Sequence, residues 1–343
     1  MKKKNIAVIS TTFNRAPQLY RHLWTINSQD FPHSDFWVII VDDGSVDETQ
    51  EVIAAAAENF PTLSIINIRT DRKPPDSFGG QGIAYNVGLR CAEDLGVEYV
   101  ILTGGDMLIT SCAMRKHMEV QTDVRRRAWT ISSKDKTKET EYRLMVDQIS
   151  DVPDILLGSD LFYIRPDHQT LGNDQLLLSA VVGNLDWQPA ENLLHQWSAL
   201  TIEPIEGADH NHLGFTGDVV VSRTHPEWTT WQSCKLQYWL DIGGFDEAGT
   251  GHFWEEEQLE RRFNLYNKYR EELGLKSILA MTHESPLVCC FHQPHPRQLS
   301  NIDNREIFRK NVERYGFDVN KGQGIDWGRA KHEIISKREY TLR

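Results

Sequence analysis

Residues 36–45 read Phe-Trp-Val-Ile-Ile-Val-Asp-Asp-Gly-Ser, an apolar run that stops abruptly at two carboxylates and a glycine. A short uninterrupted apolar run is typical of a strand that is buried on both faces of a parallel sheet. Gly44 permits a tight turn, and Asp42 and Asp43 place oxygen acceptors at the end of the strand. The pattern predicts a strand over 36–41 and a polar turn that can accept hydrogen bonds from a ligand; a plain turn that caps the next helix is the alternative.

The segments around this run alternate between strand-like and helix-like patterns. We expect strands over 5–10, 36–41, 63–68 and 98–103, and helices from Pro17 through Ile26, from an N-cap at Asp47 to about Asn59, and over 82–95. This alternation predicts an α/β fold with a central, mainly parallel sheet, right-handed crossovers and flanking helices. The polar turns that follow these strands should converge on one cleft, because ligands bind beyond the carboxyl ends of parallel strands.

The second half of the chain has fewer clear strand and helix patterns. Residues 219–222 are strand-like, 255–272 are helical, and the apolar run 287–291 leads into a histidine-containing segment. No repeat or low-complexity linker marks residues 111–216 as an independent domain. The tail from about Asn301 is expected to form one helix followed by a poorly ordered polar segment.

Composition narrows the class of protein. Lys and Arg number 37 against 49 Asp and Glu, a net charge of −12, which makes broad binding to nucleic acid or anionic membranes unlikely. The five cysteines lack CxxC spacing and are expected to be reduced and partly buried. No stretch approaches the roughly 20 apolar residues that span a bilayer, so no transmembrane segment and a cytoplasmic location are expected.

Three segments of the first half together resemble a known family. They are Ser10-Thr-Thr-Phe-Asn-Arg15, Val41-Asp-Asp-Gly-Ser45 and Gly79-Gly-Gln-Gly82-Ile-Ala-Tyr-Asn86-Val-Gly88-Leu89. They are similar to the opening of family 2 glycosyltransferases and their relatives. The resemblance implies the GT-A fold, a Rossmann-like nucleotide-diphospho-sugar transferase fold. It implies a GT-A domain over 1–300, with a nucleotide-sugar half (1–110), a variable insert (111–216) and an acceptor or catalytic half (217–300), followed by a helical tail (301–343).

The same resemblance implies which residues surround the nucleotide sugar. They are Thr11, Asn14, Arg15, Asp43, Arg69, Asp71, Gln81 and Asn86. The family has an Asp-x-Asp motif where this chain has Gly104-Gly-Asp106, so only the last carboxylate is kept. That carboxylate is expected to bind Mn²⁺ or Mg²⁺, since both prefer oxygen ligands. His292, rather than His295, is the expected histidine ligand.

The acceptor half carries the remaining site candidates. Gly243-Gly-Phe-Asp246-Glu247 and the helix start at 253–262 resemble the family segments that hold the general base. Aligning them places Glu256 as the base that deprotonates an acceptor hydroxyl; an exposed acidic helix start is the alternative. Acceptor contacts are expected from Asp246, Glu255, Trp228 and Trp231. Asp246 can instead cap its turn, and tryptophans also fill cores.

These features predict sugar transfer from a nucleoside diphosphate sugar to a carbohydrate or other hydroxyl acceptor, with inversion implied by the resemblance to family 2. Two alternatives remain. Gly104 is compatible with a non-catalytic sugar-nucleotide or carbohydrate-binding relative. Nucleotidyl transfer onto a sugar phosphate ranks below both, because the turn after the first strand lacks the glycine-rich loop of that class.

Overall fold

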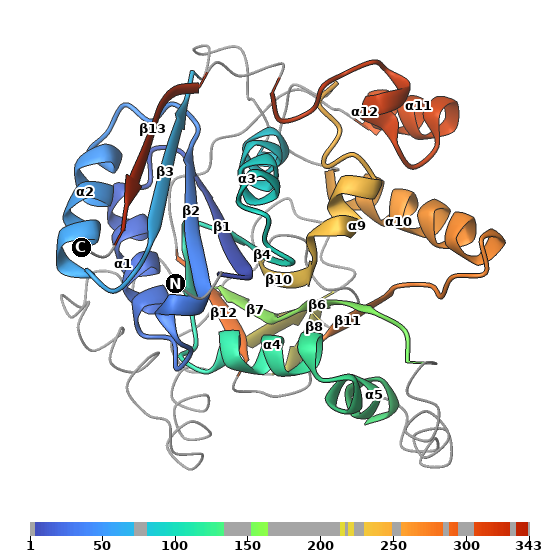
Figure 1. Ribbon diagram of the computed structural model, residues 1–343, viewed down its shortest axis with the longest axis horizontal. Coiled ribbons are helices and arrows are strands. Elements are labelled where there is room, and N and C mark those ends of the chain that lie inside the picture. Colours follow the sequence, from blue (N-terminus) through green and yellow to red (C-terminus); the bar gives the residue numbers. More distant parts are fainter. Residues whose placement is uncertain are drawn as a thin grey trace.

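The computed structural model describes residues 4–71, 81–133, 152–163, 213–216, 219–222, 230–248, 255–283, 288–293, 305–329 and 334–341 (Figure 1). The strands are β1 (Ile6–Thr12), β2 (Phe36–Asp42), β3 (Ile65–Thr70), β4 (Tyr99–Gly104), β5 (Met107–Ile109), β6 (Ile155–Gly158), β7 (Asp160–Tyr163), β8 (Leu213–Thr216), β9 (Val219–Ser222), β10 (Thr230–Lys235), β11 (Leu279–Thr282), β12 (Cys289–His292) and β13 (Ile334–Tyr340). The helices are α1 (Ala16–Asn27), α2 (Thr49–Asn59), α3 (Gln81–Leu95), α4 (Ala113–Thr122), α5 (Val124–Ser133), α9 (Leu236–Asp241), α10 (Glu255–Glu272), α11 (Arg305–Tyr315) and α12 (Val319–Gly322), with a short 3₁₀ turn at His33–Asp35.

An eight-stranded sheet in the order β11-β6-β10-β4-β1-β2-β3-β13 forms the centre of the molecule. Strands β3, β2, β1 and β4 are parallel neighbours, whereas β10 and β13 join antiparallel. The chain moves outward from β1 through β2 to β3 and then returns to place β4 on the other side of β1. This reversal of direction is the topological switch point at which open α/β sheets bind ligands.

Two hydrophobic cores lie on opposite faces of the sheet, because successive side chains of a buried strand point to opposite sides. In β1, Ala7 and Ile9 face the core beneath α3, α9 and α10, while Ile6 and Val8 face the core beneath α1 and α2. Figure 1 shows α3 on one side of the sheet and α1 with α2 on the other. The near-continuous apolar sequence of these strands therefore reflects burial on both faces.

Helix α3 packs unusually close to the sheet because of two glycines. A Cβ atom at Gly88 would overlap the Cγ2 atom of Ile9 in β1. A Cβ atom at Gly82 would lie 2.9 Å from the Cβ atom of Phe245. Both glycines belong to the motif quoted above, so its glycines are explained by the close approach of α3 to β1 and to the loop that carries Phe245.

Two small sheets complete the fold. Strands β5, β12 and β7 form one, and β8 and β9 form the other. The antiparallel register of β5 with β12 pairs Met107 with His292. This pairing brings the histidine-containing segment next to the turn that follows β4.

Most elements expected from the sequence are confirmed. The four N-terminal strands, the three helices between them, strand 219–222 and helix 255–272 are all present, with ends shifted by a few residues at most. Glu48 is the N-cap of α2, so the expected cap at Asp47 is wrong by one residue; the Asp47 carboxylate still accepts the backbone N–H of Thr49 at 3.2 Å.

The C-terminal tail differs from expectation. After α11 and α12, residues Ile334–Tyr340 form β13, which pairs with β3 at the edge of the main sheet. The expected poorly ordered segment is therefore wrong for these residues. The pattern was not recognised because β13 is largely exposed and carries no apolar alternation, while backbone hydrogen bonds need no particular side chain. The division of the chain into halves, insert and tail stays a prediction.

Two expectations from composition can be compared with the described residues. None of the helices in these ranges is both long and apolar enough to cross a membrane. Cys91, Cys112, Cys234 and Cys290 are buried free thiols, as expected. Burial raises the pKa of the Cys234 thiol to about 12, so this sulfur stays protonated and unreactive at neutral pH.

The close contact of Gly88 with Ile9 predicts a steric cost for Gly88→Ala. Overpacking costs about 1–3 kcal/mol, of which the better helix propensity of alanine offsets up to about 1 kcal/mol. We expect a net loss in the free energy of unfolding, measured by urea titration. In a double-mutant cycle, Ile9→Ala should make Gly88→Ala much less costly. Strict additivity of the two changes would contradict the contact.

Candidate functional site

The turns after β1 and β4 meet at the switch point. The backbone N–H of Gly105 donates to the carbonyl of Thr11 at 2.8 Å. A Cβ atom at residue 105 would lie 2.9 Å from that same oxygen. Glycine at this position therefore allows the turn that carries Asp106 to lie directly against β1. Thr11 is buried and contributes its backbone carbonyl to this junction.

The Asp-Asp-Gly-Ser turn after β2 is held by its first carboxylate. Asp42 is fully buried, and its Oδ1 atom accepts the backbone N–H of Ser45 at 2.8 Å, while its Oδ2 atom accepts the amide of Gln50 at 2.5 Å. Asp43 is held by the Thr70 hydroxyl at 3.2 Å, and Arg69 donates to the carbonyl of Ser45 at 2.8 Å. Asp42 thus shapes the turn, and Arg69 bonds to it; the expected contacts of Asp43 and Arg69 with a nucleoside stay predictions.

Asn14 joins the first turn to the second. Its backbone N–H donates to the hydroxyl of Ser45 at 2.9 Å, and its Oδ1 atom accepts the backbone N–H of Val46 at 2.8 Å. Asn14 has a φ of 51°, a left-handed conformation that asparagine tolerates better than most residues. In this structure the Asn14 side chain organises the cleft edge, and its expected contact with a nucleotide stays a prediction.

The start of α1 lies at the same edge. Its first N–H group, that of Ala16, donates to Oδ2 of Asp47 at 3.1 Å, so Asp47 connects the starts of α1 and α2. Arg15 is half-buried beside Asp106 and Asp47; burial lowers the pKa of its guanidinium, and the two carboxylates oppose that effect. Arg15 places positive charge next to Asp106, at the amino-terminal end of α1, and this end of a helix favours anions.

Asp106 and His292 form a close pair. The register of β5 with β12 sets Met107 opposite His292, and Nε2 of His292 lies 3.7 Å from Oδ2 of Asp106. Both side chains are partly exposed, at 22% and 19%. The structure therefore brings the two expected metal ligands together, although they are 186 positions apart in the sequence. Within the described ranges, no group of three or more His, Cys, Asp or Glu side chains is arranged to hold a metal.

Gly104 leaves space that Asp106 uses. A Cβ atom at residue 104 would lie 2.6 Å from Oδ1 of Asp106. An aspartate at the first position of the motif therefore requires the Asp106 carboxylate to turn away from its present position. The glycine at this position therefore permits the orientation that the Asp106 carboxylate has in this chain.

Gln293 was missed by the sequence reading. It is buried, and its backbone N–H and side-chain amide both donate to the carbonyl of Asp106, at 3.0 and 3.2 Å. The amide also donates to the carbonyl of Gln18, and Arg21 donates to its oxygen at 3.4 Å. Gln293 thereby fixes the Asp106 backbone to α1, and its place directly after His292 is the one sequence signal that could have identified it.

His22 was missed as well. It is fully buried on the apolar face of α1, where Nδ1 contacts the carbonyl of Met107 at 2.6 Å and Nε2 contacts the Ser10 hydroxyl at 2.8 Å. Burial lowers the pKa of this imidazole from 6.5 to about 4. The ring is therefore neutral at pH 7, donating to Met107 and accepting from Ser10. It anchors the residue that follows Asp106 to both α1 and β1.

The side chains of Asn86 and Asp246 form hydrogen bonds with other residues of the protein. Both amide protons of Asn86 are donated, to the carbonyl of Phe245 at 2.9 Å and to Oε1 of Glu247 at 2.8 Å. Asp246 is 5% exposed; its Oδ2 atom accepts from Gln258 and Asn311, and its Oδ1 atom accepts the backbone N–H of Ala248. Asp246 caps its turn, which was the alternative to an acceptor contact, and Asn86 holds the loop rather than an edge of the cleft.

Trp231 does not fit an acceptor site. It is fully buried in the core beneath α1 and α4, so its indole is not open to stack on a sugar. It lies at an irregularity in the pairing of β10 with β4 and has a φ of 52°, an unusual conformation for a bulky residue. The expectation for Trp231 is therefore wrong, because the bulge turns this side chain into the core.

The remaining candidates lie at the margins of the described residues. Asp71 follows β3, and Gln81 opens α3, where its amide donates to the Tyr85 hydroxyl at 3.1 Å. Glu255 and Glu256 stand in the first turn of α10, with side chains outside the described residues, and Trp228 lies outside them entirely.

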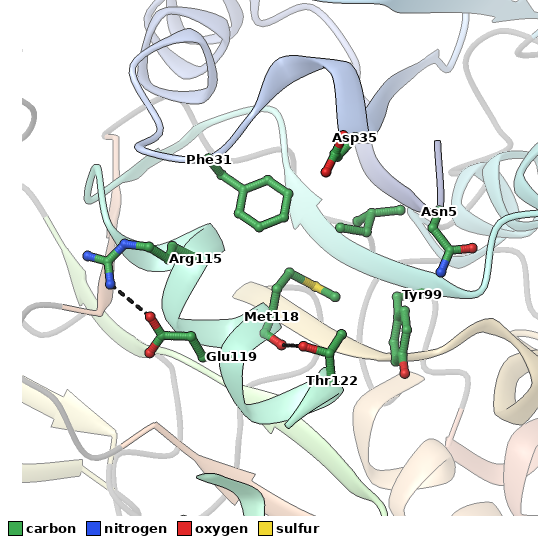
Figure 2. A pocket seen from close by; sticks show the side chains of 9 residues that line it. Asn5, Phe31, Asp35, Tyr99, Arg115, Met118, Glu119 and Thr122 are labelled. Carbon is green, nitrogen blue, oxygen red and sulfur yellow. Dashed lines mark hydrogen bonds and ion pairs between the residues drawn. The ribbon is translucent and has the colours of Figure 1, made fainter. Parts of the chain in front are cut away.

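A separate pocket of about 360 Å³ lies at the opposite, amino-terminal edge of the sheet (Figure 2). Figure 2 shows Phe31, Met118 and Tyr99 lining it, with Arg115 at its rim. Arg115 is already paired with Asp30 and Glu119, so its charge is satisfied within the protein. This pocket shares no residue with the turns at the carboxyl edge and is not a candidate for nucleotide binding.

Comparison with known proteins agrees with this geometry. Residues 7–140 match the family model described as glycosyl transferase family 2. This segment belongs to glycosyl transferase family 2. The match covers β1 to β4, the switch point and Asp106, so the family segment contains the turns that meet in the cleft. Together with the strand order, it identifies the fold as GT-A, as the sequence predicted.

Two curated relatives match a part of this chain. They are the poly(ribitol-phosphate) β-N-acetylglucosaminyltransferases TarS of Staphylococcus aureus strains Mu50 and MW2. Each is 31% identical to this chain over 100 residues, which is 29% of this chain and 16% of the relative. The similarity thus spans only a small part of these longer proteins.

Solved structures with similarity include three glycosyltransferases. The mannosyltransferase PcManGT of Pyrobaculum calidifontis, in complex with GDP-Man and Mn²⁺, has a TM-score of 0.39 at 17% identity, covering 90% of this chain and 60% of that one. Residues 1–349 of S. aureus TarS with UDP give 0.46 at 13%, covering 85% and 61%. GalNAc-T7 with UDP, GalNAc and Mn²⁺ gives 0.48 at 12%, covering 92% and 48%. These TM-scores are low, and the fold assignment rests on the family match and the strand order.

The buried neutral His22 predicts a loss of stability in acid. Between pH 6.5 and about 4, the unfolded chain binds a proton at His22 that the folded chain excludes. Stability therefore falls as the pH falls through this window, by about 1.4 kcal/mol per pH unit for this group. The free energy of unfolding, measured by urea titration from pH 7.5 to 4, should depend less on pH in His22→Gln. His33→Gln, at a half-buried histidine far from the cleft, should change the slope less. An unchanged slope in His22→Gln would refute the assignment.

Proposed function

We propose that this protein transfers a sugar from a nucleoside diphosphate sugar to an acceptor hydroxyl, with the help of a divalent cation and with inversion at the anomeric carbon. The observation that carries the proposal is the 3.7 Å pair of Asp106 and His292 at the switch point. Asp106 lies within the family 2 segment, and His292 lies outside it in the sequence. An α/β sheet of this order binds ligands at that point.

The residues at this point suit Mn²⁺ or Mg²⁺. One carboxylate and one imidazole provide an oxygen and a nitrogen ligand, and substrate phosphates commonly supply further oxygens to such cations. Asp106 and His292 would hold the cation. When bound, it neutralises charge on the departing diphosphate. Arg15, half-buried beside Asp106, adds positive charge on the same side, where the start of α1 also favours phosphate.

The turns of the nucleotide-sugar half provide the nucleoside site in this proposal. Asp43 accepts a hydrogen bond from Thr70, and Arg69 donates to the carbonyl of Ser45 in the turn after β2. This turn is fixed to β1 by the 2.9 Å bond from the N–H of Asp43 to the carbonyl of Thr12. Fixed acceptors and donors suit the base edge and ribose hydroxyls. Because the curated relatives are named as N-acetylglucosaminyltransferases, an N-acetylglucosamine nucleotide is the first donor to test.

Glu256 is assigned as the general base. It stands in the first turn of α10, two residues before Gln258, whose amide donates to the buried carboxylate of Asp246 at 2.7 Å. In this role its carboxylate takes the proton of the acceptor hydroxyl while that oxygen attacks the anomeric carbon and the bond to the diphosphate breaks. The proton ends on Glu256, and the electron pair of the broken bond leaves with the diphosphate.

Gly104 supports a second candidate function. A family relative with one carboxylate fewer can bind sugar nucleotides without turning them over, which would make this chain a binding module. The two functions differ in donor hydrolysis, because a transferase usually releases some free sugar from its donor in the absence of acceptor, whereas a binding module does not.

Metal-dependent donor binding is the first prediction of the transferase assignment. UDP, GDP, CDP and dTDP sugars, each with Mn²⁺, Mg²⁺ or EDTA, are compared by thermal shift. One nucleotide class should raise the melting temperature by several degrees with metal, because binding at 100 times the Kd stabilises by about 2.7 kcal/mol. Asp106→Asn and His292→Ala should remove the metal-dependent part.

The matched control is Asp94→Asn, an exposed carboxylate on α3, which should behave like the wild type. A shift that is equal in metal and in EDTA would argue against a bound cation. No shift with any nucleotide would refute the donor site and with it the proposed function.

Glu256→Gln tests the base. The change keeps the size of the side chain and removes its ability to accept the proton, so kcat for transfer should fall by about 10²–10⁴-fold. Donor affinity, measured by calorimetry, should stay within about twofold. Glu260→Gln, on an exposed position of the same helix, should retain full activity. If Glu256→Gln loses donor binding and transfer to the same extent, its assignment as base is wrong.

A further inference from the structure

The loop 242–248 before α10 is held by buried amides from both sides. The carbonyl of Phe245 accepts one hydrogen bond from Asn86 of α3 at 2.9 Å and another from Asn320 of α12 at 2.6 Å. Asn320 also donates to the carbonyl of Gly243 at 2.7 Å and accepts the N–H of Glu247 at 3.1 Å. Both asparagines are fully buried. The loop is therefore fixed by side chains that lie 234 positions apart.

The loop in turn is connected to the first turns of α10. Oδ2 of Asp246 accepts from Gln258 at 2.7 Å and from Asn311 of α11 at 2.8 Å. The buried guanidinium of Arg262 donates to the carbonyl of Ile242 and, at 2.7 Å, to that of Phe317. The start of α10 is thus tied to the loop and to the C-terminal residues at two successive turns.

Arg262 of α10 is a buried charge whose hydrogen bonds depend on both the loop and the C-terminal region. It is fully buried, and burial lowers its pKa to about 10. A charge is costly to bury unless hydrogen bonds compensate, and the compensating carbonyls of Ile242 and Phe317 come from the loop and from the C-terminal region. Moving either segment would leave the guanidinium without those acceptors.

Residues after α12 contact both the loop 242–248 and α3. The N–H of Gly328 donates to Oε1 of Glu247 at 2.6 Å, and the ring of Trp327 stacks under the guanidinium of Arg90 at 3.8 Å. A Cβ atom at Gly244 would lie 2.6 Å from that ring, so the loop and the tryptophan are in direct contact. Figure 1 shows α11 and α12 beside α10.

We propose that residues 305–329 form a brace that positions the base-bearing end of α10, and that Asn320 is a positioning residue for transfer. Asn320 holds the backbone on both sides of Asp246, Asp246 holds Gln258, and Gln258 stands two residues after Glu256. The proposal rests on the proposed function insofar as Glu256 is the base. It makes this C-terminal segment part of the active site instead of an appended tail.

The energetic argument favours a large effect from one side chain. Removing Asn320 leaves the carbonyl of Gly243 and the N–H of Glu247 without this partner in a buried setting, which is unfavourable for each of these polar groups. A shift of about 1 Å at a catalytic group can reduce a rate about 100-fold. Without Asn320 we therefore expect the loop to relax locally and the base to move from its position.

Asn320→Ala in the full chain tests the brace, with Asn267→Ala as matched control. Asn267 lies at the far end of α10, where its amide donates to the carbonyl of Ile278 at 2.9 Å and accepts the N–H of Ile278 at 2.8 Å. Both variants remove an asparagine that holds a backbone segment, but only one faces loop 242–248. Amide hydrogen exchange, kcat and donor affinity are measured for both.

We expect Asn320→Ala to increase exchange at least about tenfold at residues 242–248 and 255–262, and to lower kcat at least about tenfold with donor affinity within about twofold. Asn267→Ala should leave kcat and this exchange unchanged. Normal exchange and kcat in Asn320→Ala would overturn the proposal, as would equal losses of kcat in both variants. If Asn320→Ala does not fold, Asn311→Ala, which removes the 2.8 Å bond to Asp246, decides by the same readouts.

Hydrogen exchange separates this proposal from the proposed function. If the wild type neither binds a donor nor transfers sugar, faster exchange in Asn320→Ala still establishes the brace. If the wild type is active and Asn320→Ala leaves kcat and exchange unchanged, the brace is wrong and the transferase assignment stands.

Discussion

The carbonyl group of Phe245, shared by Asn86 and Asn320, connects the parts of the structure that a transferase must hold together. Asn86 belongs to α3, which packs on β1 through Gly88 and so is fixed to the centre of the main sheet. Asn320 belongs to the C-terminal region. The loop between them precedes the helix that carries Glu256. Because a buried carbonyl with two donors is costly to leave unpaired, this group helps to fix the loop before α10, together with the pairing of β10 with β4 in the main sheet.

The fold of residues 1–110 was predictable because its determinants are local. Each strand from β1 to β4 is a short apolar run, each helix follows directly, and the parallel order follows from this alternation. The turn after β2 was located correctly, but the different roles of its two aspartates were not evident from the sequence. Asp42 accepts hydrogen bonds from within the turn and from α2, whereas Asp43 accepts from Thr70 at the end of β3. Both carboxylates are buried, and their partners are set only once the sheet is formed, so spacing alone does not separate them.

The errors have a common physical cause. Trp231 was expected at a sugar site because its sequence neighbours are polar, yet a bulge in β10 turns it into the core. β13 was expected to be poorly ordered because it lacks apolar residues at a regular spacing, yet its backbone pairs with β3. Both features depend on contacts between distant segments. The Asp106–His292 pair is also long-range, and it was predictable only through the resemblance to family 2.

The lack of space for a side chain at Gly104 limits which carboxylates can hold the proposed metal. A side chain there would displace Oδ1 of Asp106, so this chain cannot present two motif carboxylates in the present geometry. Asp106 instead lies 3.7 Å from His292, and its backbone is fixed on both sides of the turn. Gln293 holds the carbonyl of Asp106, and His22 holds that of Met107. A site with fewer charged ligands depends more on their exact placement, and these two buried side chains, neutral at pH 7, provide it without adding charge that would compete with a cation.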